Sequence, residues 1–393
     1  MSGSTTKTDI TRSTRILRRL KDVPGLKEEE KQELDAVVKE YPFQASEYYL
    51  SLIDWDDPND PIRRIVIPDI SELKEGGDLD ASDEESNYEA PGVQHKYPHT
   101  ALLLCTDFCD SLCRYCFRKR LFREPSNEIA RNVDEGIEYI RQTERITNVL
   151  LTGGDPLMMP TTRLVDIFEK LREIPHVGII RIGTKTPAFR PQRIIGDPKL
   201  IEAFEKYSTP QKRIYIIAHY DHPRELTDVS IEALDLMLRS GVHIINQNPL
   251  LAGINDDPKV LVELYRKIAR IGVCPYYLFI CRPTSGNEDF KVPIVRSYFI
   301  LEEAKRHLCG LDKRVRLVMS HASGKIEVVG VDESNMYLRY HRARNPENEG
   351  KFMVFPRDDE ACWFDDLTGE QAGESAMPVT VAFGGACGVN GDG

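Results

Sequence analysis

The stretch of sequence that decides the fold is LLLCTDFCDSLCRYCFRKR, residues 102–120. It starts as an apolar run of the kind that forms a buried strand, and it leads directly into a loop that carries Cys109, Cys113 and Cys116. Iron–sulfur clusters are held by cysteine thiolates, commonly four. Three thiolates in one short loop would therefore leave one iron of a [4Fe–4S] cluster open to a small molecule.

A structural zinc ion is the alternative for these thiols. Zinc takes four ligands in structural sites, and Cys105 is the candidate for the fourth. Cys105 lies inside the apolar run that precedes the loop, so we expect its side chain to face the core. We therefore favour the cluster over zinc.

Short apolar runs and helical patterns alternate after this stretch. The apolar runs are 101–105, 148–152, 178–183, 214–219, 243–247 and 276–280. The helical patterns between them are 127–142, 161–173, 198–207, 226–240 and 257–272. Continuous apolar strands that alternate with helices predict parallel βαβ units. Six units fit an α/β fold with a partial (β/α)6 barrel of the TIM type, although a doubly wound sheet has the same rhythm.

The flanks of this region predict two further parts. We expect an N-terminal helical extension with an exposed acidic loop at 72–89, the partial barrel, and a C-terminal β-rich segment with a mobile glycine-rich tail. Their boundaries are 1–95, 96–310 and 311–393. The C-terminal segment carries the apolar runs 315–320, 325–330 and 336–341.

Composition limits the classes of function. The chain has 393 residues, 41% of them hydrophobic and 29% charged, which is typical of a folded globular protein. Its net charge of −11 argues against nucleic acid or an anionic membrane as a partner. The N-terminus has no apolar core of a secretory signal, and nine cysteines are an odd number for a disulfide framework. These features predict a cytoplasmic protein.

A second motif follows one βα unit after the cysteines. The next predicted strand ends in Gly153, Gly154 and Asp155. Glycines let a backbone come close to a ligand, and a carboxylate accepts hydrogen bonds from an ammonium group. Together with CxxxCxxC and the aromatic Tyr115 before its last cysteine, this pattern resembles the radical SAM superfamily. The resemblance implies that the cluster binds S-adenosylmethionine and that the glycine motif holds the amino group of that cofactor.

Longer segments resemble lysine 2,3-aminomutase and its relatives over roughly residues 45–355. They include YLSLIDWDDPNDPIRRIVIP, HKYPHTALLLCTDFC, LREIPHVGIIRIGTKTP, AHYDHPRE, NQNPLLAGIND, PYYLFIC and SGKIEVV. The resemblance implies a radical SAM isomerase that binds a [4Fe–4S] cluster, S-adenosylmethionine and pyridoxal 5′-phosphate (PLP). Such enzymes move an α-amino group to the β-carbon of an amino acid. An electron donor such as flavodoxin or ferredoxin is the implied partner.

Within this resemblance, Lys325 takes the place of the lysine that binds PLP, and a surface lysine at a hairpin is the alternative. The family's HRYPxR is HKYPHT here, so that Lys96 and Tyr97 are candidate cofactor contacts while Thr100 stands for an arginine. Phe279 stands where the family has tyrosine. Lysine and threonine do not replace a bidentate arginine. These departures favour the alternative function, a PLP-independent radical SAM epimerase, dehydratase or dehydrogenase, whereas Lys325 and Arg118 oppose it.

Three residues bear on the substrate. Arg118 aligns with the arginine that binds the α-carboxylate, and a solvated position in the basic run is its alternative. Arg282 replaces an aspartate that holds the ammonium group of lysine, and Ser320 replaces a second one. A cation there repels an ammonium group and attracts a carboxylate. The pattern resembles glutamate 2,3-aminomutases and predicts L-glutamate as substrate, unless Arg282 turns away to pair with Glu288 or Asp289.

Further matched positions are His219, Asn246 and Gln247, at strand ends that contact S-adenosylmethionine or PLP in the family. The family's inter-subunit zinc site uses a cysteine where this chain has Asp257, and the tail offers only Cys387. We therefore expect no such zinc site, and a homodimer is the candidate assembly. A non-enzymatic protein that kept the fold is a third alternative, which the intact cysteine and glycine motifs oppose.

Overall fold

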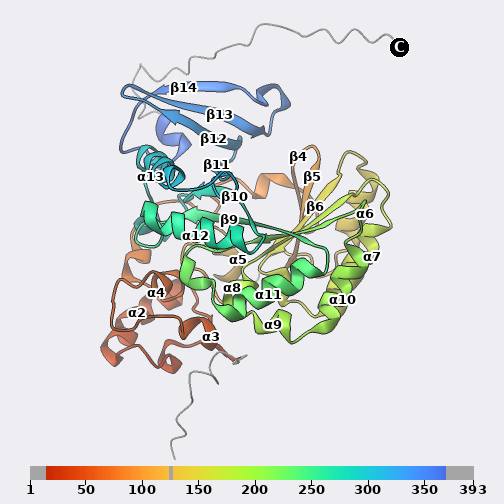
Figure 1. Cartoon of the computed structure of the whole chain (residues 1–393), viewed down its shortest axis with the longest axis horizontal. Helices are drawn as coiled ribbons and strands as arrows, with labels where there is room; N and C mark the ends of the chain where they lie inside the picture. The colour runs from red at the N-terminus through yellow and green to blue at the C-terminus, as the bar shows by residue number, and fades with distance from the viewer. Residues whose placement is uncertain (1–14, 124–126, 369–393) are drawn as a thin grey trace, which may run out of the picture.

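A twelve-stranded sheet organises the computed structural model, which describes residues 15–123 and 127–368. The strands lie in sequence order from β3 at one edge to β14 at the other. In Figure 1 the red N-terminal helices lie below the sheet, and the blue C-terminal strands form its upper edge. The middle of the sheet forms the predicted partial barrel.

The barrel strands run parallel to one another. They are β5 (Thr100–Thr106), β6 (Asn148–Gly153), β7 (Ile179–Thr184), β8 (Ile214–Ala218), β9 (His243–Leu250), β10 (Cys274–Ile280) and β11 (Arg316–His321). The first six are the six predicted strands. The sequence pattern assigns β11 to the C-terminal segment, but Leu317 of β11 pairs in parallel with Leu278 of β10. The parallel sheet therefore continues beyond residue 310 with a seventh strand.

Helices connect the parallel strands and cover one face of the sheet. The longer ones are α6 (Asp134–Gln142), α7 (Thr161–Arg172), α10 (Pro198–Tyr207), α11 (Asp228–Arg239), α12 (Pro258–Arg270) and α13 (Ile294–Arg306). In α12, the buried Leu261, Leu264 and Ile268 recur at helical spacing, and Asp257 caps the N-terminus by accepting from the Lys259 N–H. The helix predicted to start at residue 127 starts at Asp134 instead.

The sheet has a packed face and an open face. In β9, Ile244, Asn246 and Leu250 are buried, while Ile245 and Gln247 between them are partly exposed. Because side chains alternate along a strand, the buried set faces the helices and the other set faces the barrel interior. The apolar core therefore lies between the sheet and its helices, and Gln247 faces the barrel interior.

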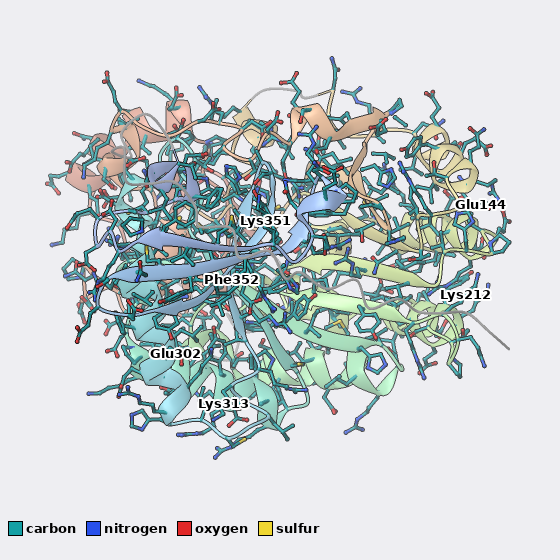
Figure 2. All side chains as sticks on the ribbon, turned by 90° about the horizontal axis from the view of Figure 1, so that it is seen from above. Glu144, Lys212, Glu302, Lys313, Lys351 and Phe352 are labelled. Atoms are coloured by element: carbon teal, nitrogen blue, oxygen red, sulfur yellow. The ribbon has the colours of Figure 1, made fainter. Side chains whose placement is uncertain are left out.

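Antiparallel strands extend both edges of the sheet. They are β3 (Tyr88–Ala90) and β4 (Val93–Tyr97) on one side, and β12 (Gly324–Val331), β13 (Asn335–Ala343) and β14 (Phe352–Pro356) on the other. The two predicted C-terminal runs correspond to β12 and β13, and β14 is an additional strand. Seen from above, Phe352 and Lys351 lie over the C-terminal strands, whereas Glu144 and Lys212 lie at the right edge of the view (Figure 2).

The N-terminal extension has its own apolar cluster. Its helices are α2 (Glu28–Glu40), α3 (Glu47–Leu50) and α4 (Pro61–Val66). Val37, Tyr48 and Ile62 are fully buried there, together with Leu251 and Phe290 from loops that follow barrel strands. The predicted helical extension is thus packed against the end of the barrel where those loops lie.

The acidic segment 72–89 differs from its prediction as an exposed loop. Glu72 and Glu84 are 3% and 8% exposed. Buried arginines pair with both carboxylates, which stabilises their charges away from water. Some acidic residues of the segment, Glu72 and Glu84, therefore form buried ion pairs, and others lie at the surface.

The glycine-rich tail and Cys387 lie in 369–393, outside the described residues. Across 15–123 and 127–368, no helix is long and apolar enough to cross a membrane.

Candidate active site

The cysteine loop follows β5 and is held by the N-terminal extension. The N–H of Leu112 donates to Gln44 O at 2.8 Å, and that of Arg114 donates to Ile65 O at 2.8 Å. The Gln44 side-chain amide also donates to Cys109 O. The extension thus positions the loop at the C-terminal end of β5, the end at which (β/α) barrels carry their active sites.

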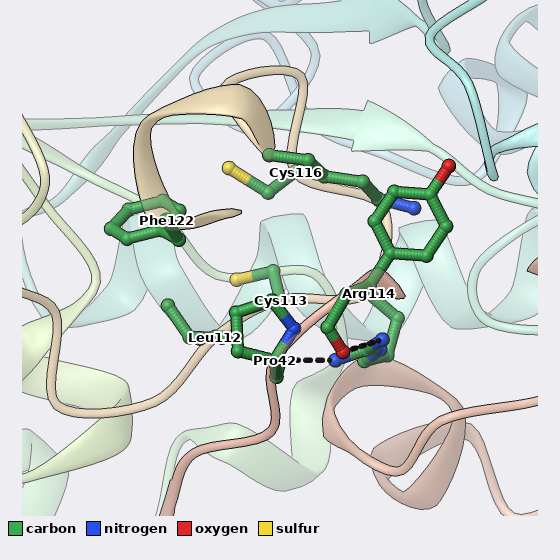
Figure 3. A pocket seen from close by; sticks show the side chains of 8 residues that line it. Pro42, Leu112, Cys113, Arg114, Cys116 and Phe122 are labelled. Carbon is green, nitrogen blue, oxygen red and sulfur yellow. Dashed lines mark hydrogen bonds between the residues drawn. The ribbon is translucent and has the colours of Figure 1, made fainter. Parts of the chain in front are cut away.

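The thiols of Cys109, Cys113 and Cys116 lie in this loop. In Figure 3 the sulfur atoms of Cys113 and Cys116 extend to the same side of a small pocket, toward Leu112 and Phe122. Burial raises the pKa of all three thiols, and neighbouring thiols add to the rise at Cys109 and Cys113. Three thiolates therefore need a cationic partner here, and iron ions supply that charge.

The fourth ligand of a structural zinc ion would have to be Cys105. Cys105 takes no part, since it is fully buried in β5 and its thiol lies 3.6 Å from Thr152 O. The candidate fourth zinc ligand thus faces the core, as predicted.

The two glycines at the end of β6 are pressed against the cysteine loop. Gly153 has a φ of +111°, and a Cβ there would lie 2.3 Å from Thr106 O. A Cβ on Gly154 would lie 2.5 Å from Phe108 O. Both glycines are therefore required by the contact between β6 and the loop after β5, in addition to any approach of a ligand.

The carboxylate of Asp155 is bonded within the protein. It accepts from Thr184 Oγ1 at 2.7 Å and from the N–H groups of Lys185 and Thr186 at 2.8 and 2.9 Å. It also accepts from the Leu157 N–H at 3.1 Å. This side chain ties the end of β6 to the end of β7. A direct contact between this carboxylate and an ammonium group would require one of these bonds to break.

A buried ion-pair network that no motif reveals lies beside Cys113. Lys185 Nζ is 2.7 Å from Asp221 Oδ2 and 2.6 Å from Glu225 Oε1. His219 Nε2 lies 3.0 Å from Asp221 Oδ1, and its side chain stays 28% exposed. The charge of Lys185 lowers the pKa of Cys113, against the larger effect of burial. The network thus orients His219 and places a cation behind the cysteine loop.

Lys325 lies in β12 with its amine over two aromatic rings of β10. Lys325 Nζ is 4.5 Å from the centroid of Tyr277 and 5.2 Å from that of Phe279. The residue is partly buried, unlike a lysine at an exposed hairpin. Burial, followed by the charges of Arg181 and other cations, lowers its pKa from 10.5 to about 7. A neutral amine, the nucleophilic form, is therefore present near neutral pH.

The predicted contacts Lys96 and Tyr97 end β4 and lie near the turn before Lys325. Lys96 Nζ donates to His321 O, and burial lowers the pKa of Lys96 to about 8. The Tyr97 hydroxyl is buried and has no hydrogen-bond partner among the described residues. Ser320 of β11 pairs with Lys325 across the strands. An unpartnered hydroxyl beside cationic amines fits a ligand group rich in acceptors, such as a phosphate.

The basic run after the cysteine loop is buried. Arg118 makes two hydrogen bonds to Glu84, both 3.0 Å long, and donates to Thr152 Oγ1 at 2.8 Å. Arg282 stacks on Phe117, 3.7 Å from the ring centroid, and lies 3.7 Å from Glu84 Oε1. Burial lowers the pKa of Arg282. Glu84 belongs to the segment that was predicted to be an exposed loop. Its carboxylate lies between Arg118 and Arg282, the two arginines predicted to bind substrate.

The alternative partners of Arg282 are bonded elsewhere. Glu288 pairs with Lys291 at 2.7 Å, and Asp289 pairs with Lys74 at 2.6 Å. Arg282 therefore turns toward Phe117 and Glu84.

Asn246 and Gln247 are neighbours in β9 and face opposite sides of the sheet. Asn246 is 1% exposed and exchanges hydrogen bonds of 2.8 and 3.2 Å with the backbone of Tyr220. Gln247 is partly exposed on the interior face. Of the two predicted contacts, Gln247 is the one that a ligand in the barrel interior can reach.

Known proteins resemble the chain over most of its length. Residues 103–265 match the Radical SAM superfamily. A protein named "Putative L-lysine 2,3-aminomutase" from Aquifex aeolicus is 51% identical over 350 residues, which cover 89% of this chain and 94% of the relative. L-lysine 2,3-aminomutase of Clostridium subterminale is 40% identical over 74% of this chain and 69% of its own length. Glutamate 2,3-aminomutase of Clostridioides difficile is 35% identical over 74% and 68%.

The identity and coverage of these relatives exceed what a shared fold alone produces. They agree with a loop of three free thiols next to a glycine motif at the ends of adjacent strands. The chain therefore belongs to the lysine 2,3-aminomutase family of the radical SAM superfamily, and is an isomerase whose family uses a [4Fe–4S] cluster and S-adenosylmethionine.

Proposed function

We propose that this isomerase is a PLP-dependent 2,3-aminomutase that moves the α-amino group of an acidic amino acid, foremost L-glutamate, to the β-carbon. The observation that carries the proposal is the charge of the candidate site. Lys96, Arg118 and Arg282 bring cations to it, and Glu84 is the carboxylate that the two arginines share. A substrate with two carboxylates supplies negative charge that this site lacks.

The cluster and S-adenosylmethionine would lie at the ends of β5 and β6. The three loop cysteines would hold the cluster, and Gly153, Gly154 and Gln247 would border S-adenosylmethionine. Asp155 would keep the glycine motif in place through its bonds to the end of β7. His219, held by Asp221, would border the same space from β8.

Lys325 would hold PLP, with Lys96 and Tyr97 near its phosphate. When bound, PLP supplies a conjugated ring that accepts the electron of a neighbouring carbon radical. With a pKa of about 7, about half of the Lys325 side chains are neutral at neutral pH and able to bond to an aldehyde. The rings of Tyr277 and Phe279 lie beside the amine.

Arg118 and Arg282 would position the substrate. A guanidinium carries five N–H groups, so Arg118 keeps N–H groups for an α-carboxylate beyond those bonded to Glu84 and Thr152. Arg282 would bind the side-chain carboxylate, and the hydroxyl group of Ser320 would donate a hydrogen bond to it. A lysine substrate would find Glu84 already bonded to Arg118 and Arg120, the latter at 2.8 Å.

We propose the division 1–95, 96–310 and 311–393 as working segments, which one twelve-stranded sheet joins. We also propose a cytoplasmic location and a flavodoxin or ferredoxin as electron donor. A homodimer is the proposed assembly. Light scattering on the purified chain measures the assembly, and a monomeric mass would contradict it.

Borohydride trapping tests the cofactor. The cluster is reconstituted without oxygen, PLP is added, and the reduced protein is mapped by mass spectrometry. We expect a pyridoxyl group on Lys325 and none on the exposed Lys313. An unmodified Lys325 in protein with an intact cluster would contradict the aminomutase and favour a PLP-independent radical reaction.

Arg282→Gln tests the substrate. Loss of a cation that faces a substrate carboxylate is expected to lower kcat/KM for glutamate on the order of ten- to a hundredfold. The control is Arg296→Gln, whose side chain is 58% exposed. PLP trapping at Lys325 should be unchanged in both variants. Equal activity of R282Q and wild type on glutamate would show that Arg282 does not bind the substrate.

A further inference from the structure

Arg342 is brought to the side of Lys325 by an irregularity between β12 and β13. Lys325 pairs with Arg342, whereas the next residue, Ile326, pairs with Tyr340, so His341 is an extra residue in β13. Such a bulge places two residues of one strand against one residue of the other and re-aims their side chains. Arg342 therefore lies directly across from the proposed PLP lysine.

The close approach of the two strands at this point depends on Gly324. A Cβ at Gly324 would lie 2.3 Å from Arg342 O and 3.0 Å from Ala343 Cα. The glycine before Lys325 thus makes room for the backbone of Arg342, in addition to any space it leaves for a cofactor. This contact fixes the position of Arg342 relative to Lys325.

The guanidinium of Arg342 lies at the segment in which the chain departs from its family. It stacks on Tyr97, 4.4 Å from the ring centroid, and its Nη1 lies 3.3 Å from Thr100 Oγ1. Thr100 is the position where the resemblance places an arginine. The guanidinium of Arg342 therefore lies at position 100, where the family has an arginine and this chain has threonine. Arg342 comes from β13, near the opposite edge of the sheet in the strand order.

Arg342 has no carboxylate in direct contact among the described residues, and the acidic groups near Lys96 and Tyr97 act on them from further away. Among the described residues, no carboxylate lies within 4.0 Å of Arg342, Arg181 or Lys96, although each is at least partly buried. The hydroxyl of Tyr97, on the ring under Arg342, has no hydrogen-bond partner in the part of the chain that the structure describes. Buried cations and an unpartnered donor in one place are the features of a site for an anion that carries several acceptors.

We propose that Arg342, together with Lys96 and the Tyr97 hydroxyl, binds the phosphate of PLP, so that an arginine from β13 replaces the one missing at position 100. This inference rests on the proposed PLP-dependent function. A guanidinium can donate two parallel hydrogen bonds to a phosphate, which neither lysine nor threonine can do. A comparison between a ligand with a phosphate and one without it distinguishes this site from a site for a substrate carboxylate.

The test compares PLP with pyridoxal, which has the same aldehyde and ring but no phosphate. Dissociation constants of both are measured by absorbance titration of the full-length protein with its cluster, and borohydride trapping confirms Lys325 as the site. The variants are Arg342→Gln and Arg342→Lys. The control is Arg339→Gln on the same strand, whose side chain is 41% exposed and pairs with Glu327.

We expect R342Q to weaken PLP binding on the order of ten- to a hundredfold. Pyridoxal binding should weaken far less, through the rise in the pKa of Lys325 that loss of a neighbouring cation causes. R342K should fall between R342Q and wild type, and R339Q should bind both ligands as the wild type does. Equal loss of PLP and pyridoxal binding in R342Q, or no loss, would overturn the assignment. Failure of the wild type itself to bind PLP at Lys325 would overturn the proposed function, and that result is visible before any variant is made.

Discussion

At the scale of single residues, the chemistry of Lys325 is set by groups that are distant in the sequence. Burial is the largest cause of its low pKa, and Arg181, Arg342, Arg282 and Lys96 follow as neighbouring charges. These residues come from β7, β13, the end of β10 and β4. An amine with a low pKa is neutral more often, and the neutral form is the one that bonds to an aldehyde. The same low pKa decreases the free energy of unfolding, because the folded state does not favour the charged form of Lys325.

Lys325→Met should therefore stabilise the protein, and the gain should depend on pH. The pKa of Lys325 is lowered from 10.5 to about 7, so between these values the unfolded chain binds more protons than the folded one, and wild-type stability rises with pH. The gain from K325M is expected to be full below pH 7 and to fade as pH approaches 10.5. Urea unfolding from about pH 6 to about pH 10 measures it.

The exposed Lys313→Met is the control for this prediction, and its effect is expected to be small at every pH. A K325M protein that is less stable than the wild type at about pH 6 would contradict the buried, poorly compensated charge that we assign to Lys325.

The residues that could be predicted from the sequence are those that sit in a local pattern. The cysteines and glycines of the two motifs, and Lys325 by resemblance, are of this kind. Glu84 was hidden in a segment whose composition suggests a surface loop. Arg342 could not be found, because the bulge that turns it toward Lys325 depends on the pairing of β12 with β13. Lys185 and Asp221 meet only through the parallel pairing of β7 and β8.

At the scale of elements, the central feature is the contact between β6 and the loop that follows β5. The N–H of Gly154 donates to Thr106 O at 2.6 Å, and the N–H of Asp155 donates to Phe108 O at 2.9 Å. No side chain fits between Gly154 and Phe108. The glycine motif therefore positions the cysteine loop, and the two motifs act as one unit.

Gly154→Ala should reduce cluster loading. The added Cβ would lie 2.5 Å from Phe108 O, so the cysteine loop must move. We expect a several-fold fall in iron bound per chain after reconstitution, measured by iron analysis and by absorbance of the cluster. In the control Gly183→Ala, the nearest atoms lie at 3.8 Å and loading should be normal. Normal iron content in G154A would show that the loop does not depend on this contact.

The elements themselves were largely predictable, since apolar runs of strand length alternate with helical patterns. All six predicted parallel strands are present, and α7 and α10 match their predicted ranges within one residue. The seventh parallel strand was assigned to another segment, because a run such as VRLVMS fits a parallel or an antiparallel strand equally well. Direction is fixed by the crossover through α13, which periodicity does not show.

At the scale of the whole molecule, the N-terminal extension and the barrel are joined at the cysteine loop. Arg114 donates to both carboxylate oxygens of Glu72, at 2.8 and 2.9 Å, and to Pro42 O at 2.8 Å. The two side chains are 3% and 2% exposed. A single buried arginine therefore connects the loop to two segments of the extension.

Arg114→Met should destabilise the protein by about 3–5 kcal/mol, because it leaves the carboxylate of Glu72 buried without this partner. Urea unfolding measures the loss, and limited proteolysis should cut the extension earlier. The control Arg141→Met removes an exposed ion pair with Glu173 and should cost about 0–1 kcal/mol. Equal stability of the two variants would mean that the extension is not fastened at Arg114.

The most direct test of the central claim is the identity of the product. The chain, with cluster, S-adenosylmethionine, PLP and a reductant, is incubated without oxygen with isotopically labelled L-glutamate or L-lysine, and the label is followed by NMR. We predict that the amino group of glutamate moves to the β-carbon and that lysine reacts far more slowly. Formation of the β-amino acid from lysine, or consumption of S-adenosylmethionine without a β-amino acid from either substrate, would contradict it.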